Sequence, residues 1–335
     1  MAAYTLVSTD PLILLYEGFV AADECRTLLE MSQAVFARRD CTCELSAGDW
    51  TSAQQRLVDT LEDRIGQIIG CAPHAEEMPL LPLREVRADA STRSDPARAL
   101  RKSLHVDTNG GVPRRFASAL LYLTSPTNGG QTVFPLASTA GHDAPPIDCQ
   151  KRSKALAASR QLLKAGCAHT GNSRKSAARV IEALVSHAPR VDTPPVDAAY
   201  AATSGGVGIR PIAGNLLVFW TRDPTGISER SWHGGELVPH DSSEDKWLLR
   251  KFKEVPVAVF EDVKARAAFL ECSRRPYMAP SRADVASESP HPIGGGPAMP
   301  LPTRPKQLQP GCQTRASPPP RDPPGALKRK RGGAQ

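Results

Sequence analysis

Hydrophobic and polar residues follow two different periods along the first seventy residues. Residues 5–19 are mostly apolar and look extended, and apolar residues then recur at helical spacing over residues 22–36. After a loop at 37–50, a second helical pattern covers residues 51–70 and ends at Gly70, a residue type that often ends helices. The chain is therefore predicted to begin with an extended segment followed by two helices.

Short strand patterns separated by turns replace the helices after residue 80. Strand patterns are predicted at 80–88, 116–123, 131–135, 206–212, 214–220, 231–238 and 246–252. Residues 137–204 interrupt them with a segment rich in Ala, Ser, Lys and Arg, which has helical patterns at 151–166 and 174–187. This order predicts an α+β protein with a mainly β core, N-terminal supporting helices and a long helical or irregular insert.

The pattern changes again after the last strand. Residues 257–275 have the spacing of one amphipathic helix, whereas residues 279–335 contain 13 of the 31 prolines and almost no large apolar side chains. Such a composition is typical of disordered segments. The predicted organisation is a domain at 1–256 with its insert at 137–204, a C-terminal helix at 257–278, and a disordered, proline-rich, basic tail at 279–335.

Charge and cysteine usage add expectations about location and partners. The net charge is +7, and residues 328–331 read KRKR, which fits a nuclear localisation signal, a tether to an acidic partner, or simply a charged end. The apolar run at 12–16 is too short for a signal peptide, and no stretch is long enough to span a membrane. With eight irregularly spaced cysteines, we expect an intracellular protein, cytoplasmic or nuclear, with no membrane partner.

One pair of residues suggests metal chemistry. His105 and Asp107 are two positions apart in a segment with strand character, so their side chains point to the same face. His233, in a later strand segment, could supply a third ligand. Two histidines and one carboxylate form a facial triad that suits non-haem Fe(II) and leaves coordination positions open. By itself, however, such a pair is more often two polar residues on the wet face of a strand.

Two further residues fit the co-substrate of this chemistry. Enzymes that pair such a triad with 2-oxoglutarate need a cation and a hydroxyl group for the far carboxylate of that molecule. Lys246 lies one hairpin after His233, and Tyr122 lies in the strand after the His-x-Asp segment. Each has an ordinary alternative, a solvated edge lysine and a packed core tyrosine. Their joint placement favours the site.

Several sequence blocks occur in the order found in one family. They are H-x-D at 105–107, RFASALLYL at 115–123, GGQTVFP at 129–135, a P-x-x-G-x-x-x-x-F-W pattern at 211–220, HGGELV at 233–238, and the Lys246-Trp247 pair. The chain resembles the prolyl 4-hydroxylase family of Fe(II)/2-oxoglutarate dioxygenases, whose pattern reads R-x-A-T-x-L-x-Y-L in the second block. The resemblance covers roughly residues 8–253 apart from the insert.

The resemblance implies a double-stranded β-helix (jelly-roll) fold and a set of site residues. It implies His105, Asp107 and His233 as iron ligands, Lys246 and Tyr122 as partners of the C5 carboxylate of 2-oxoglutarate, and Thr132 and Trp247 as residues that line or brace that pocket. The implied cofactors and co-substrates are Fe(2+), 2-oxoglutarate, O2 and L-ascorbate. Because the turn after His233 is longer than in the family, Arg250 is an alternative anchor on the Lys246 face.

The implied activity is hydroxylation of peptidyl proline to 4-hydroxyproline, with release of succinate and CO2. The implied partner is then a protein or peptide substrate that contains proline. The same chemistry on a nucleic acid or a free amino acid is an alternative, as is a non-catalytic interaction protein built on a dioxygenase barrel. The insert is interpreted as a solvated surface excursion, with a lid over substrate or partner as the alternative. The sequence indicates no particular oligomeric state.

Overall fold

The computed structural model describes residues 3–37, 44–45, 50–88, 104–108, 113–139, 149–166, 199–201 and 206–278. All of them belong to one unit, Met1–Ser281. The helix predicted at 174–187 and the tail predicted at 279–335, with its KRKR run, lie outside the described residues. Within the described part, no helix is long and apolar enough to cross a membrane.

The two N-terminal helices are confirmed as α1 (Ala22–Ala37) and α2 (Ser52–Ile69). At the start of α2, Thr51 and Gln54 form a reciprocal capping box, in which each side chain accepts a hydrogen bond from the backbone of the other residue. At its end, Gly70 adopts the left-handed conformation with φ of 72°, which glycine adopts without the steric cost of a Cβ atom. The ends of this helix are thus determined locally.

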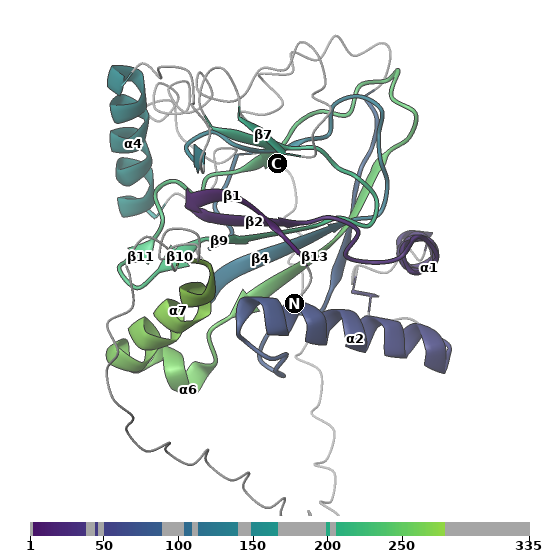
Figure 1. Cartoon of the computed structure of the whole chain (residues 1–335), viewed down its shortest axis with the longest axis horizontal. Coiled ribbons are helices and arrows are strands. Elements are labelled where there is room, and N and C mark those ends of the chain that lie inside the picture. Colours follow the sequence, from purple (N-terminus) through teal and green to yellow (C-terminus); the bar gives the residue numbers. More distant parts are fainter. Residues whose placement is uncertain are drawn as a thin grey trace, which may run out of the picture. The chain divides into compact units, whose positions relative to one another are not determined.

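Seven antiparallel strands form a large sheet (Figure 1), in the order β3-β13-β4-β9-β2-β1-β6. The strands are β1 (Thr5–Asp10), β2 (Leu12–Tyr16), β3 (Leu81–Glu85), β4 (Arg115–Tyr122), β6 (Ser138–Thr139), β9 (Leu216–Trp220) and β13 (Lys246–Glu254). The extended N-terminal segment is therefore a pair of strands, which lies between β9 and the short edge strand β6.

A smaller sheet has the order β12-β5-β8-β7. Its strands are β5 (Thr132–Phe134), β7 (Ala199–Ala201), β8 (Val207–Ile209) and β12 (Gly234–Gly235), and a separate hairpin pairs β10 (Arg222–Asp223) with β11 (Gly226–Ile227). The strand predicted at 231–238 is thus much shorter than expected. The adjoining His233 instead pairs with His105 through an isolated antiparallel bridge.

The large sheet has a helix-covered face and an inner face. Apolar residues of α1, α2 and α7 (Val263–Met278) pack in one cluster with Leu121, Val218 and Leu249 of the sheet. On the inner face a second cluster joins residues of the large sheet to Phe134 and Ile209 of the small sheet. The fold is therefore α+β, as predicted, with two antiparallel sheets that enclose an apolar layer.

The insert helix α4 (Cys149–Lys164) packs against the protein instead of projecting into solvent. Its residues Ala155 and Leu162 share a cluster with Val106, Val133 and Trp232, which lie around the small sheet. For this part of the insert, the interpretation as a solvated excursion is wrong, because one stripe of the helix is buried.

The prediction of one continuous C-terminal helix at 257–275 is wrong. The segment forms a short helix α6 (Val257–Phe260) and then α7. Asp262 lies between them, and its Oδ1 accepts hydrogen bonds from the backbone N–H groups of Lys264 and Ala265 at 2.8 and 3.0 Å. A side chain that caps the first turn in this way favours a new helix start.

Candidate metal centre

The two histidines of the predicted triad are held by direct backbone pairing. His105 and His233 each donate a backbone hydrogen bond to the other's carbonyl, at 2.8 and 2.9 Å. Their imidazole rings consequently lie side by side, with centroids 4.4 Å apart. Two segments far apart in the chain thereby present their side chains at one place.

Asp107 completes the group. Its Oδ1 lies 3.2 Å from His105 Nε2, and its Oδ2 lies 3.4 Å from His233 Nε2. One ligand atom from each of the three residues falls within 4.8 Å of the others. The structure therefore brings the predicted His-x-Asp…His triad together, with two imidazole nitrogens and one carboxylate available as donors.

Neighbouring groups orient the ligands. His233 Nδ1 lies 2.9 Å from the Ser231 carbonyl, which can only accept, so Nδ1 donates this hydrogen bond and Nε2 is the ring nitrogen that faces Asp107. Ser118 Oγ on β4 donates a 2.5 Å hydrogen bond to Asp107 Oδ2. Phe134 stacks on the His233 ring and Phe219 packs edge-on against it. These supporting roles were not predicted from the sequence, although Ser118 occupies the Thr position of the second family block.

The charge state of the carboxylate suits a cation. Burial works to raise the pKa of Asp107, but His233 and His105 lower it through charge and hydrogen bonds, so the pKa lies well below its usual range. The carboxylate is consequently ionised at neutral pH. A donor set of two imidazoles and one carboxylate fits a divalent transition metal such as Fe(II).

The residues predicted to hold 2-oxoglutarate form a second group on the inner face. Tyr122 Oη donates a 2.8 Å hydrogen bond to Thr132 Oγ1, which joins the large sheet to the small one. Lys246 is 1% exposed, and its Nζ lies 6.0 Å from the centroid of the Tyr122 ring. Burial raises the pKa of Tyr122, so its hydroxyl stays protonated. A buried cation and two hydroxyls thus lie near one another.

Lys246 has an ionic partner that the sequence analysis missed. In the pairing of β13 with β3, Lys246 is directly opposite Glu85. The Lys246 Nζ lies 3.2 Å from both Glu85 carboxylate oxygens. Their opposite charges are the only sequence signal for this contact, because the register that aligns them is not visible in the chain itself.

The structure does not bring Trp247 to this group. As the next residue of β13, it points to the opposite, helix-covered face. There it packs edge-on against Phe36 at 5.1 Å and lies under the Arg84 guanidinium. Any bracing of the pocket by Trp247 would have to act through the strand backbone.

Arg250 shares the inner face with Lys246, as expected from the two-residue period. It is opposite Leu120 of β4, which lies two residues from Tyr122 on one side and two residues from Ser118 on the other. Its guanidinium carbon lies 5.2 Å from the centroid of the Phe252 ring. Its place on the strand keeps it as an alternative anchor for a carboxylate.

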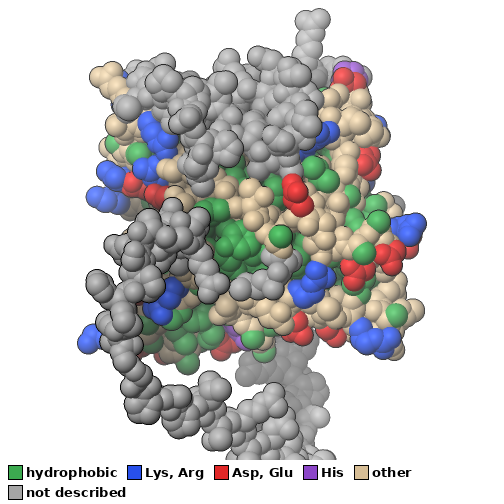
Figure 2. All heavy atoms as spheres, in the orientation of Figure 1, with side chains coloured by type: hydrophobic (Ala, Val, Ile, Leu, Met, Phe, Trp, Pro, Cys, Tyr) green, Lys and Arg blue, Asp and Glu red, His purple; other side chains and the backbone are tan. Residues whose placement is uncertain are grey.

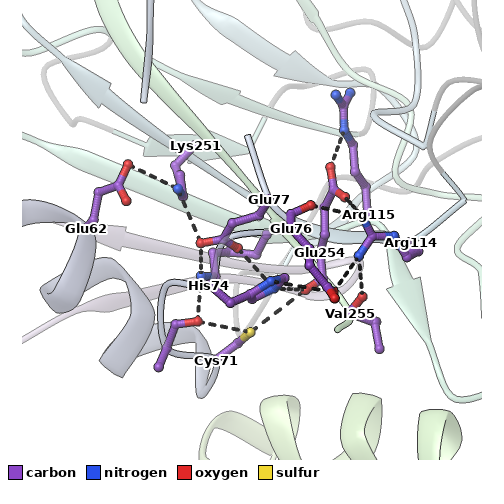
Figure 3. Close-up of polar contacts among 12 residues, drawn as sticks. Glu62, Cys71, His74, Glu76, Glu77, Arg114, Arg115, Lys251, Glu254 and Val255 are labelled. Carbon is purple, nitrogen blue, oxygen red and sulfur yellow. Dashed lines mark hydrogen bonds and ion pairs between the residues drawn. The ribbon is translucent and has the colours of Figure 1, made fainter. Parts of the chain in front are cut away.

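A buried ionic network lies beneath the strands that carry the site (Figure 3). Lys251 Nζ is 3.1 Å from Glu62 Oε1 on α2 and 3.2 Å from Glu77 Oε1. Lys253 Nζ lies 2.7 Å from the same Glu77 oxygen. Lys251 and Lys253 of β13 are therefore neutralised by carboxylates of α2 and of the segment that follows it.

A further set of ion pairs reaches the candidate ligand Asp107. At the end of β13, Glu254 pairs with Arg114 at 3.1 Å and with Arg115 at 3.5 Å. The Arg115 Nη1 also lies 3.5 Å from the backbone carbonyl of Asp107. The ligand segment is thus linked to the frame of the large sheet.

Comparisons with known proteins give only remote similarity. No family model and no curated protein matches the chain. Among solved structures, the chain is similar to the viral collagen prolyl hydroxylase vCPH of Paramecium Bursaria Chlorella virus-1, with 14% identity and a TM-score of 0.36, over 76% of this chain and 96% of that one.

Two further similarities are of the same order. A Pseudomonas putida prolyl-4-hydroxylase is 16% identical with a TM-score of 0.34, over 74% of this chain and 90% of that one. A taurine dioxygenase from Burkholderia xenovorans is 15% identical with a TM-score of 0.28, over 55% of this chain and 67% of that one. Likenesses this remote support no conclusion about the function of this chain.

Proposed function

We propose that the protein is an Fe(II)- and 2-oxoglutarate-dependent dioxygenase that hydroxylates its substrate and releases succinate and CO2. The observation that carries the proposal is the convergence of His105, Asp107 and His233 within 4.8 Å. The hydrogen bond from His233 Nδ1 to the Ser231 carbonyl supports the proposal, because it leaves Nε2 facing the other two residues as the atom that would bind the metal. When bound, the metal with 2-oxoglutarate and O2 supplies the oxidation of a C–H bond.

In this proposal the residues of the chain bind the metal and orient 2-oxoglutarate. His105, Asp107 and His233 hold Fe(II) from one side. Lys246 binds the C5 carboxylate of 2-oxoglutarate. The Tyr122 hydroxyl, whose single proton goes to Thr132 Oγ1 in the structure, redirects this hydrogen bond to the same carboxylate, and Thr132 lines the pocket. We prefer Lys246 to Arg250 as the anchor because Lys246 lies beside the Tyr122 ring.

The finer parts of the proposal are the fold type, the domain limits and the substrate. We infer that the two sheets are the halves of a double-stranded β-helix within a domain at 1–256, that 257–278 is an appended helical segment, and that 279–335 is a separate tail. Peptidyl proline is the proposed substrate class, supported by the order of the sequence blocks. L-ascorbate is proposed to restore iron to its Fe(II) state.

Nucleic acid is a weaker candidate. Lys and Arg side chains are interspersed with Asp and Glu over the face shown in Figure 2 and do not gather into one basic stripe there. A nucleic-acid site needs a concentrated positive surface for the phosphates. The coloured part of this face therefore offers no specific support for that substrate.

The activity is tested by supplying Fe(II), 2-oxoglutarate and ascorbate to the full chain and measuring succinate. A panel of proline-containing peptides is then examined by mass spectrometry for a product heavier by one oxygen atom. We expect His233→Ala and Asp107→Ala to abolish succinate formation, because each removes a ligand. The matched control is His240→Ala, an exposed histidine in a turn, which should leave turnover unchanged.

Each part of this proposal can fail separately. Wild-type turnover in either ligand variant would show that the triad is not the metal site. Strong 2-oxoglutarate turnover without oxidation of any peptide would leave the dioxygenase proposal intact and exclude the proline substrate class.

A further inference from the structure

The lysine proposed to anchor 2-oxoglutarate is already bound to a carboxylate of the protein. Lys246 is 1% exposed, and both carboxylate oxygens of Glu85 lie 3.2 Å from its Nζ. The contact follows from the register of two neighbouring strands, which places the residues directly opposite each other on the inner face. Glu85 therefore occupies the position at the Nζ that the C5 carboxylate would take.

The surroundings fix the lysine more firmly than the glutamate. A Cβ atom on Gly130 would lie only 3.3 Å from Lys246 Cδ, so the lysine stem is closely packed. A Cβ atom on Gly235 would lie 2.7 Å from Glu85 Oε1, so the carboxylate fits against β12 only because that residue is glycine. The Glu85 side chain is nevertheless 29% exposed. It has a path to water, whereas Lys246 has none.

Besides Glu85, a second acidic residue of the protein, Glu236, lies near Lys246. Burial raises the pKa of Glu236, while a hydrogen bond with the Gln131 backbone and the charge of Lys246 oppose that rise. Glu236 Oε2 is buried and has no hydrogen-bond partner among the described residues. If Glu85 stayed in place, the incoming carboxylate would share one lysine with at least one other acid. An uncompensated buried charge is costly.

We propose that Glu85 is an internal competitor of 2-oxoglutarate, which must leave Lys246 and turn toward solvent before the C5 carboxylate can bind. This inference rests on the proposed function. Glu85 then sets the affinity for 2-oxoglutarate and for other acids with a distal carboxylate. Ligands that lack this carboxylate do not need the exchange.

The test measures binding directly, without turnover. The full chain is loaded with Mn(II) in place of Fe(II) and titrated calorimetrically with 2-oxoglutarate and with 2-oxopentanoate, which has a methyl group in place of the distal carboxylate. Glu85→Gln keeps the shape and removes the charge. We expect it to bind 2-oxoglutarate about tenfold more tightly or better, with the 2-oxopentanoate affinity changed by less than about twofold.

Further variants separate this exchange from other effects. In a Lys246→Met background, Glu85→Gln should no longer tighten 2-oxoglutarate binding, because the competition acts through the lysine. Glu271→Gln, an exposed change on α7, is the matched control and should alter neither ligand. If Glu85→Gln proves unstable in thermal unfolding, Glu85→Asp takes its place, since the shorter side chain reaches Lys246 less well.

The outcomes are distinct. Unchanged or weaker 2-oxoglutarate binding in the folded Glu85 variant, with normal binding by the wild type, overturns the competitor role and leaves the proposed function standing. Equal tightening of both ligands also overturns it, because the effect would then not concern the distal carboxylate. Failure of the wild type and all Glu85 variants to bind 2-oxoglutarate, despite bound Mn(II), overturns both.

Discussion

At the scale of single residues, the proposed metal site depends on groups that touch the candidate ligands and would not touch the metal itself. Ser118 is the clearest example, because its hydroxyl holds one carboxylate oxygen of Asp107 at 2.5 Å. A neighbouring hydrogen bond of this kind fixes the direction of a ligand and adjusts its basicity. The second family block has Thr at this position, which could make the same bond.

We predict that Ser118→Ala weakens Mn(II) or Fe(II) binding by about tenfold, because Asp107 loses its fixed orientation. Ser118→Thr keeps the hydroxyl and should retain the wild-type affinity. Equilibrium dialysis with each metal measures the effect, and Ser243→Ala, an exposed serine in a turn, serves as the control. Equal metal affinity in Ser118→Ala and the wild type would exclude this role.

At the scale of elements, the insert helix α4 supports the small sheet. Ser159 accepts a 2.9 Å hydrogen bond from Trp232 Nε1 and donates one of 2.6 Å to the Glu229 carbonyl. Trp232 immediately precedes the ligand His233. The helix α4 therefore packs behind the segment that carries His233, which gives this part of the insert a structural role.

We predict that Ser159→Ala lowers the free energy of unfolding by about 1–3 kcal/mol, because the buried Trp232 N–H loses its partner. Metal affinity should fall with it, since the His233 segment loses support. Chemical denaturation and a metal titration measure the two effects. Gln161→Ala, exposed on the same helix, is the control, and equal stability of the two variants would show that α4 does not brace the site.

At the scale of the whole molecule, the buried network joins the helical layer to the large sheet. Glu77 contacts both Lys251 and Lys253, and all three side chains are nearly inaccessible. Removal of one partner from such a group leaves buried charge uncompensated, which costs more than the pair contributed. The network is therefore sensitive to loss of any one member.

We predict that Glu77→Gln lowers the free energy of unfolding by about 3 kcal/mol, because two buried lysines lose their shared carboxylate. The control is Glu271→Gln, which breaks an exposed pair with Arg275 and should change stability by less than about 0.5 kcal/mol. Urea denaturation compares them. A change for Glu77→Gln as small as that of the control would mean that the network does not stabilise the fold.

Features that depend on the local period and on residue chemistry could be read from the sequence. The end of helix α2 at Gly70 and the grouping of His105, Asp107 and His233 could be predicted, because they follow from the helical period and from the donors that iron prefers. The strand predicted around His105 and Asp107 was not found, since His105 makes only an isolated bridge and Asp107 lies in a turn. The break before α7 was missed, although Asp262 was a visible cap.

Only the tertiary structure decided which segments meet. The Glu85–Lys246 pair, the Ser118 contact and the packing of α4 depend on strand register and on burial between residues far apart in the chain. Register is selected by the total burial of a sheet, and a shift of one residue moves every side chain to the other face. Trp247 follows the same rule. It is the residue after Lys246 in β13, so its side chain lies on the helix-covered face while Lys246 lies with Tyr122 on the inner face.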